Sequence, residues 1–275
     1  MKKPKNIKMQ INQEQRAYYA WKYLTEIAAS KGKTSYKELA RAVGISHHRP
    51  TRYFLGLIQD YCLENKLPPL TILVVNKSGK PGEGFIAWDV NNLVEGRNSV
   101  YAYNWGILVN PFSYAYGGST KEEIVKQLLD APNKSREVYS IIQCRGMVQR
   151  IFRDAVMIAY DKRCAICDFG VIDVLEASHI VAWKDSNETE KMDVRNGILL
   201  CATHHKLFDY GYITINEDYT INYNDPELQR RAYLDYELSM TTNFRGKKIR
   251  LPKNTKHYPS VEYFKKHKKS FEEKK

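Results

Sequence analysis

The chain has 275 residues, 43% hydrophobic and 12% aromatic, so it is long enough for two domains with packed cores. Its formal net charge of +12 excludes a strongly acidic protein and favours a polyanionic partner. No apolar run is long enough to span a membrane, and the lysines at the start are not followed by the apolar stretch of a signal peptide. Of the five cysteines, three have zinc-like spacing, which favours a reducing compartment. We therefore expect a cytoplasmic protein.

The first part of the chain, residues 12–65, has the pattern of short helices. The motif Ser35-x-x-Glu38 is a capping box for a helix that ends near Gly44. Pro50 suits the first turn of the next helix, and the turn between the two is typical of a helix-turn-helix. The run 71–75 is then predicted to be a buried strand, followed by a glycine-rich turn at 78–84.

Two runs in this region resemble the winged-helix part of alkylguanine-DNA alkyltransferases. They are Ser-Tyr-Lys-Glu-Leu-Ala-Arg-Ala-Val-Gly at 35–44 and Pro-Leu-Thr-Ile-Leu-Val-Val at 69–75. The nucleophilic cysteine of that family would follow the second run, where this chain has Asn-Lys-Ser at 76–78, so no alkyl transfer is implied. The resemblance implies a winged-helix-like domain that docks on duplex DNA. The alternative is a small helical domain that serves folding or protein contacts. The expected DNA-binding residues are Arg41, His48, Arg49 and Arg52.

Residues 91–118 are rich in aromatic side chains, which could pack the first domain or contact nucleic acid. The segment 132–135, Pro-Asn-Lys-Ser, is the predicted linker. We therefore predict an N-terminal domain over 1–132 and a second domain over 136–275, with a basic C-terminal tail.

The positive charge is concentrated at the two ends. Lys2, Lys3, Lys5 and Lys8 lie at the start, and the segment 245–275 has 12 Lys or Arg against three Glu. Counterion release makes such segments bind phosphates, so we expect Lys247 and Lys248 to contact a nucleic-acid backbone. The alternative is that both ends are solvated tails that only improve solubility.

Four residues of the second domain have the spacing of a structural zinc site: Cys164, Cys167, Cys201 and His204. Two ligand pairs with x2 spacing are what a closed tetrahedral zinc site requires. A small domain with little core of its own would gain folding energy from such an ion. The neighbouring His205 leaves open which of the two imidazoles is the ligand.

The polar residues that remain have the composition of a hydrolytic centre: His179, Asn196, His205 and Asp209. Together with the zinc pattern, they resemble the HNH nuclease family, which has a ββα-metal fold. The resemblance implies that His179 is the general base, that Asn196 orients the base and holds the loop before it, and that His205 binds a catalytic divalent ion such as Mg²⁺. Asp209, four residues later on the same predicted helix face, could be a second ligand or a simple helix-end carboxylate.

The chain departs from the HNH pattern at two places. A histidine, His204, stands where the usual family form has a fourth cysteine. Ser178 stands directly before the predicted base, where many HNH nucleases have an aspartate or histidine that binds the ion. We interpret Glu176 as structural.

Further motifs over 138–271 are similar to the bacterial restriction-type HNH subfamily. They are Arg-Gly at 145–146, Phe-Arg at 152–153, and Gly-Lys-Lys-Ile-Arg-Leu-Pro at 246–252. The overall expectation is an α+β protein, a mainly helical winged-helix-like domain followed by a zinc-stapled HNH domain, that cuts or nicks double-stranded DNA in restriction or anti-phage defence. The alternatives are a catalytically weak zinc DNA-binding protein, or a nuclease subunit that stays silent until it is recruited by other proteins of a defence system such as Zorya.

Overall fold

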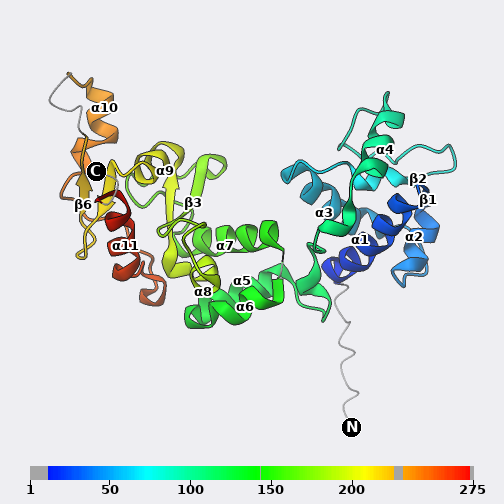
Figure 1. The fold of residues 1–275 in the computed structure, drawn as a ribbon, viewed down its shortest axis with the longest axis horizontal. Coiled ribbons are helices and arrows are strands. Elements are labelled where there is room, and N and C mark those ends of the chain that lie inside the picture. The colour runs from blue at the N-terminus through cyan, green and yellow to red at the C-terminus, as the bar shows by residue number, and fades with distance from the viewer. Residues whose placement is uncertain (1–11, 143, 226–231, 273–275) are drawn as a thin grey trace, which may run out of the picture. The chain divides into compact units, whose positions relative to one another are not determined.

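The computed structural model describes residues 12–142, 144–225 and 232–272 (Figure 1). The chain forms two compact units. The first combines residues 1–121 with 142–147, and the second combines residues 122–141 with 148–275. The four lysines at the N-terminus lie outside the described residues. None of the helices in the described ranges is long and apolar enough to cross a membrane.

The first unit is mainly helical. Its helices are α1 (Gln13–Ala29), α2 (Tyr36–Ala42), α3 (Thr51–Glu64) and α4 (Leu93–Ala102), and its strands are β1 (Thr34–Ser35) and β2 (Val74–Val75). Helix α1 packs against α3. The rings of Trp21, Tyr61, Trp105 and Phe112 contact one another edge to face, and all four are buried. Trp105 and Phe112 belong to the aromatic run at 91–118. Together with the buried Tyr114, they show that this run contributes to the core of the first unit, although Tyr116 is exposed.

The capping box predicted at Ser35 and Glu38 is confirmed at the start of α2. The predicted strand over 71–75 is wrong for most of its length, because Leu70–Leu73 form a 3-10 helix and only Val74–Val75 form a strand. The amide of Ile72 donates to the carbonyl of Pro69, which closes the helical turn after the two prolines. β2 pairs with β1 in parallel, and the described part of this unit contains no antiparallel pair that would form a wing.

The second unit contains two antiparallel hairpins among helices. Its strands are β3 (Leu175–His179), β4 (Gly197–Cys201), β5 (Ile213–Ile215) and β6 (Ile221–Tyr223). The helices that lie wholly or mostly in it are α5 (Lys121–Asp130), α6 (Ser135–Ile142), α7 (Arg145–Ala159), α8 (Glu188–Met192), α9 (Ala202–Asp209), α10 (Asp235–Met240) and α11 (Val261–Glu272). The predicted linker at 132–135 is part of this unit, and both Pro132 and Ser135 are buried.

The hairpin of β3 and β4 followed by α9 is the ββα arrangement that the sequence predicts. The register pairs His179 with Gly197 and Leu175 with Cys201. Every residue of β4 is buried, and α9 packs against both strands (Figure 1). Gly197 is required at its position because a Cβ there would collide with Val156 and Phe152 of α7.

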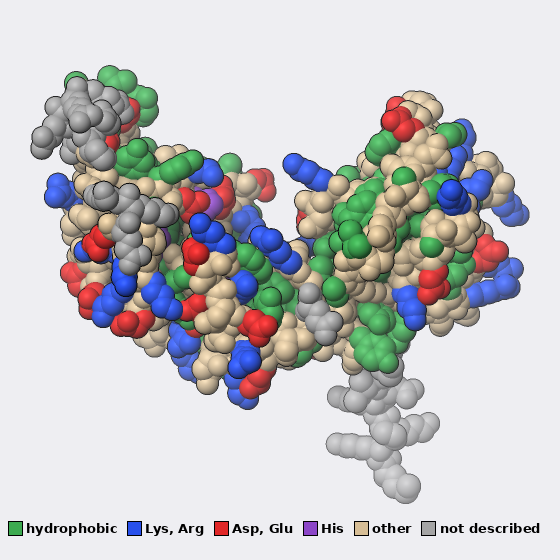
Figure 2. Space-filling model, viewed as in Figure 1, with side chains coloured by type: hydrophobic (Ala, Val, Ile, Leu, Met, Phe, Trp, Pro, Cys, Tyr) green, Lys and Arg blue, Asp and Glu red, His purple; other side chains and the backbone are tan. Residues whose placement is uncertain are grey.

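The basic C-terminal segment is not a free tail over its described length, which corrects the prediction. Ile249 and Phe264 are buried, and α11 packs against β5. The ring of His267 stacks on Phe208 of α9 at a centroid distance of 3.8 Å. The apolar side chains of α11 therefore fix this segment, while its lysines remain on the outside. On the face viewed in Figure 2, lysine and arginine side chains are interspersed with acidic ones.

Candidate metal centre and catalytic residues

The structure brings together the four predicted zinc ligands. The ligand atoms of Cys164, Cys167, Cys201 and His204 all lie within 4.8 Å of one another. Sγ of Cys167 is 3.9 Å from Sγ of Cys201, and Nδ1 of His204 is 3.6 Å from Sγ of Cys164. A tetrahedral zinc site requires about 3.8 Å between two sulfurs and about 3.5 Å between sulfur and nitrogen. The cluster can therefore bind a zinc ion with little rearrangement.

The outer contacts of the cluster decide which histidine is the ligand. Nε2 of His204 donates to the carbonyl of Met240 at 3.0 Å, which leaves Nδ1 directed at the sulfurs. A ligand imidazole usually donates its second N–H in this way. Hydrogen bonds among the thiols hold the pKa of Cys164 below its ordinary value and the pKa of Cys167 above it. His205 points elsewhere, so His204 belongs to the zinc cluster.

His179, the predicted base, lies at the end of β3 and is half-buried. Its ring stacks on Phe152 at 3.8 Å and meets Trp183 edge to face at 5.5 Å. Nε2 lies 3.1 Å from the carbonyl of Lys191. Because a carbonyl only accepts, Nε2 carries the hydrogen and Nδ1 is the nitrogen that can take a proton.

Burial lowers the pKa of His179 to about 4, although the carbonyl of Lys191 acts in the opposite direction. The imidazole is therefore neutral at pH 7, which is the state that a general base requires. Burial likewise lowers the pKa of His267, under α9, to about 4.

The half-buried His179 and the buried His267 predict that the second unit loses stability in mild acid. Each has a folded pKa of about 4 and an ordinary value of 6.5, so below pH 6.5 the unfolded chain binds more protons. The free energy of unfolding should fall as the pH drops from 7 to 5, by about 2 kcal/mol for each histidine. His267→Gln should remove about half of this histidine contribution, measured by urea unfolding at both pH values. The same substitution at the exposed His47 should leave the pH dependence unchanged, and equal slopes for all three proteins would contradict the assignment.

Asn196 holds the loop between β3 and β4. It is fully buried, and its Oδ1 accepts from the amide of Val181 at 2.8 Å. Its Nδ2 donates to the carbonyl of Glu190 at 2.9 Å and lies 3.4 Å from the hydroxyl of Ser186. Lys191, whose carbonyl accepts from His179, follows Glu190 directly. Asn196 therefore fixes the segment that orients the imidazole.

We expect Asn196→Ala to destabilise the protein by about 3 kcal/mol. The substitution leaves the amide of Val181 and the carbonyl of Glu190 without their buried partner, and each orphaned group costs roughly 1–3 kcal/mol. The measurement is urea unfolding at pH 7. Asn222→Ala is the matched control, because it removes one long hydrogen bond to Thr214, at 3.4 Å, and should cost less than about 0.5 kcal/mol. Equal losses in the two variants would show that the loop does not depend on Asn196.

His205, the predicted ligand of a second ion, lies between two carboxylates. Its Nδ1 is 2.5 Å from Oε2 of Glu176, and its Nε2 is 3.3 Å from Oδ2 of Asp209. In the described residues no hydrogen bond, ion pair or ring contact joins His205 to His179. Glu176 and Ser178 lie on one face of β3, whereas His179 lies on the other, because side chains alternate along a strand.

A divalent ion is compatible with the groups around His205. Carboxylate oxygens and an imidazole nitrogen are suitable ligands for Mg²⁺ or Mn²⁺. Ser178 is buried, and its hydroxyl contacts the carbonyl of His179 at 3.4 Å, so it does not join these groups. The structure adds Glu176, which the sequence analysis interpreted as structural, to the groups around His205. Glu176 and Ser178 are two residues apart, so their side chains share one face of a regular strand. This spacing was the sequence feature that could have placed Glu176 beside the expected ion site.

The predicted DNA-binding residues are exposed but fall in different units. Arg41 lies in the last turn of α2, and Arg52 lies in the first turn of α3, where its guanidinium donates to the hydroxyl of Tyr53 at 2.6 Å. His48 and Arg49 lie in the connection before that helix. Lys247 and Lys248 belong to the second unit, and Nζ of Lys247 lies 5.6 Å from the ring centroid of Phe244.

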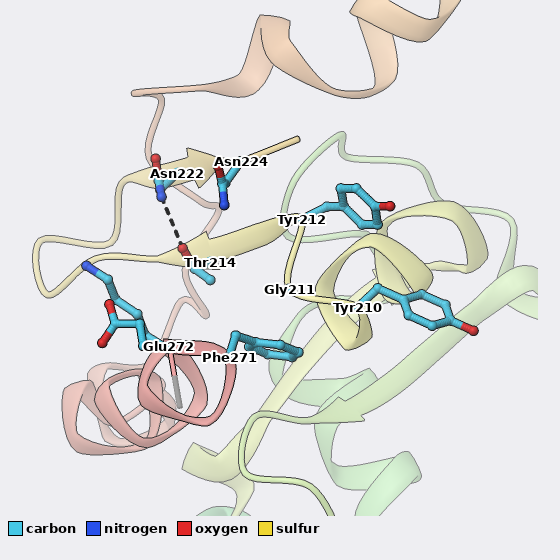
Figure 3. A pocket seen from close by; sticks show the side chains of 9 residues that line it. Tyr210, Gly211, Tyr212, Thr214, Asn222, Asn224, Phe271 and Glu272 are labelled. Atoms are coloured by element: carbon cyan, nitrogen blue, oxygen red, sulfur yellow. Dashed lines mark hydrogen bonds between the residues drawn. The ribbon is translucent and has the colours of Figure 1, made fainter. Parts of the chain in front are cut away.

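A surface pocket of about 360 Å³ lies beyond the end of α9, between β5, β6 and α11 (Figure 3). It is lined in part by Tyr210, Thr214 and Asn222, and it contains none of the predicted site residues. Gly211 has φ +74°, and a Cβ there would lie 2.6 Å from the ring of Phe271. The glycine permits both the left-handed turn after α9 and the close approach of α11.

Comparison with known proteins agrees with the ββα arrangement and its zinc-type cluster. The family model described as HNH endonuclease matches residues 164–216. This range includes β3, β4, α9 and all four ligands of the cluster. No curated protein matches the chain. Residues 164–216 are therefore similar to the HNH endonuclease family.

Proposed function

We propose that this protein is a metal-dependent endonuclease that hydrolyses phosphodiester bonds of double-stranded DNA. The observation that carries the proposal is the state of His179 inside an HNH match. The imidazole is neutral, its Nε2 hydrogen is held by the carbonyl of Lys191, and its Nδ1 is the basic nitrogen. That is the tautomer and protonation state needed to take a proton from water.

In this mechanism Nδ1 of His179 accepts a proton from the water that attacks the phosphorus. Asn196 acts through the loop, because it fixes Glu190 and hence the neighbouring carbonyl that orients the ring. Stacking on Phe152 limits rotation of the imidazole. The imidazole is therefore already oriented in the folded protein before the substrate binds.

His205 and Asp209 would hold the catalytic divalent ion. The ion, when bound, would supply the positive charge that offsets charge on the phosphate and the leaving 3′-oxygen. The four-residue spacing places both side chains on one face of α9. The zinc-type cluster at the start of the same helix would fix the position of that face.

A plasmid assay tests the proposal. The purified full-length chain should convert supercoiled plasmid to nicked or linear DNA in the presence of Mg²⁺ or Mn²⁺, and chelation of that ion should stop the reaction. His205→Ala, purified in the same way, is the control for a contaminating nuclease. If both proteins cleave at the same rate, or if neither cleaves with any divalent ion, the proposal fails.

A second candidate is a catalytically weak DNA-binding protein or a recruited subunit. It is favoured by Ser178, which stands where many HNH nucleases have an ion ligand and whose buried hydroxyl contacts the carbonyl of His179. This candidate predicts DNA binding by gel shift without cleavage, or cleavage only after a partner protein is added. A role in restriction or anti-phage defence would be supported by a lower plating efficiency of phage on cells that express the chain, compared with cells that express His179→Ala.

A further inference from the structure

The contacts of His205 extend the proposed function, on which this inference rests. The imidazole has one carboxylate at each nitrogen, Glu176 at Nδ1 and Asp209 at Nε2. One ion cannot occupy both sides of a ring, so the two carboxylates must have different roles. A metal-binding histidine usually gives its second nitrogen to a carboxylate or carbonyl that fixes the ring.

Burial distinguishes the two sides. Nδ1 is inaccessible to solvent and has no hydrogen-bond partner, and Oε2 of Glu176 lies 2.5 Å from it. The two atoms lie 2.5 Å apart without the alignment of a hydrogen bond, so a small rotation of either group is needed to form one. Because a buried N–H without an acceptor costs free energy, the carboxylate of Glu176 is the acceptor that the fold provides for Nδ1.

The Nε2 side is the better place for the ion. An ion that also binds a phosphate must be reached from solvent. The side chains of Glu176 and Asp209 are both 43% exposed, so the carboxylates do not distinguish the two sides, but Nδ1 itself is inaccessible to solvent. An ion at Nδ1 would instead have to displace the contact between Glu176 and a buried nitrogen. Ser178 cannot take either role, since it is buried and its hydroxyl contacts the backbone of its own strand.

We propose that Glu176 is a positioning residue for the ion site. Its carboxylate accepts the Nδ1 hydrogen of His205, which selects the tautomer whose Nε2 lone pair points toward Asp209. Glu176 therefore supports the ion through His205 and does not bind it. In this chain it compensates for the acidic residue or histidine that is absent at position 178.

Titration of Mn²⁺ into the zinc-loaded full-length chain, followed by electron paramagnetic resonance of the free ion, tests this role. Glu176→Ala should weaken Mn²⁺ binding by about 10- to 100-fold. Glu176→Gln should weaken it much less, because the amide oxygen still accepts the Nδ1 hydrogen. His205→Ala and Asp209→Ala should each weaken it at least as much as Glu176→Ala. Zinc content should be unchanged in all of them, and Glu262→Ala, which removes an exposed glutamate, is the matched control.

Each other outcome overturns a defined statement. Normal Mn²⁺ binding by Glu176→Ala, with loss in His205→Ala, would reject the role of Glu176 and leave the proposed function intact. Equal losses in Glu176→Gln and Glu176→Ala, with normal binding by Asp209→Ala, would make Glu176 a ligand and reject the positioning role. Normal binding by His205→Ala would reject the ion site of the proposed function itself.

Discussion

His179→Ala is expected to reduce plasmid cleavage by about 10²- to 10⁴-fold, the range that general-base groups contribute. The variant removes the imidazole that contacts the carbonyl of Lys191, while the four residues of the zinc-type cluster and the groups around His205 stay in place. Zinc content and Mn²⁺ affinity should therefore match those of the unmodified chain. The measurement is the initial rate of nicking with Mg²⁺ in excess.

The pH dependence of cleavage distinguishes His179 from solvent-exposed histidines. With a pKa of about 4, Nδ1 of His179 stays unprotonated down to about pH 5, so activity should fall only below that value. A solvent-exposed imidazole would instead cause the loss near pH 6.5. Free imidazole should restore part of the activity of His179→Ala, and His47→Ala should cleave normally. Full activity of His179→Ala would refute the assignment of the base.

The sequence predicted the zinc cluster residue by residue because ligand spacing is a local property. The x2 spacing of Cys164 and Cys167, and of Cys201 and His204, limits how far apart the ligands can lie. The hairpin register that joins the two pairs follows from the buried strand β4, all of whose residues are apolar or small. The contacts of Asn196 with the loop before it were also predictable, because Asn196 directly follows the loop between β3 and β4 whose backbone it binds.

The contacts of His205 could not be predicted in the same way. They depend on how α9 packs on β3 and on which face of the strand carries Glu176, and these are tertiary properties. The strand begins only at Leu175, after the 3-10 turn Ile172–Val174, and the sequence did not show where the strand begins. The segment after residue 245 was predicted to be a tail from its charge. Its buried residues Ile249 and Phe264 are few and widely spaced among the lysines, so they did not form a recognisable apolar pattern in the sequence.

Loss of the zinc-type cluster is expected to have the largest effect on stability. The hairpin of β3 and β4 has only five residue pairs, and α8 and α9, the α-helices that precede and follow β4 in the HNH match, have five and eight residues. The cluster connects the segment at Cys164 to the start of α9, which are 37 residues apart. Structural zinc contributes on the order of 10 kcal/mol of binding free energy to small domains. Cys164→Ser should therefore lose the zinc ion and unfold the HNH segment at 25 °C.

Zinc content by atomic absorption and limited proteolysis of the full-length chain test this expectation. Cleavage sites should appear within residues 164–216 of Cys164→Ser, whereas sites within residues 12–121 should stay protected if the first unit does not depend on the ion. Cys62→Ala is the matched control, because Cys62 is a buried thiol of the first unit that lies outside the cluster. It should lose about 1 kcal/mol of stability and no zinc. If Cys164→Ser keeps its zinc and its protease resistance, the cluster does not hold this domain together. The positions of His205 and Asp209 would then depend on the packing of α9 alone.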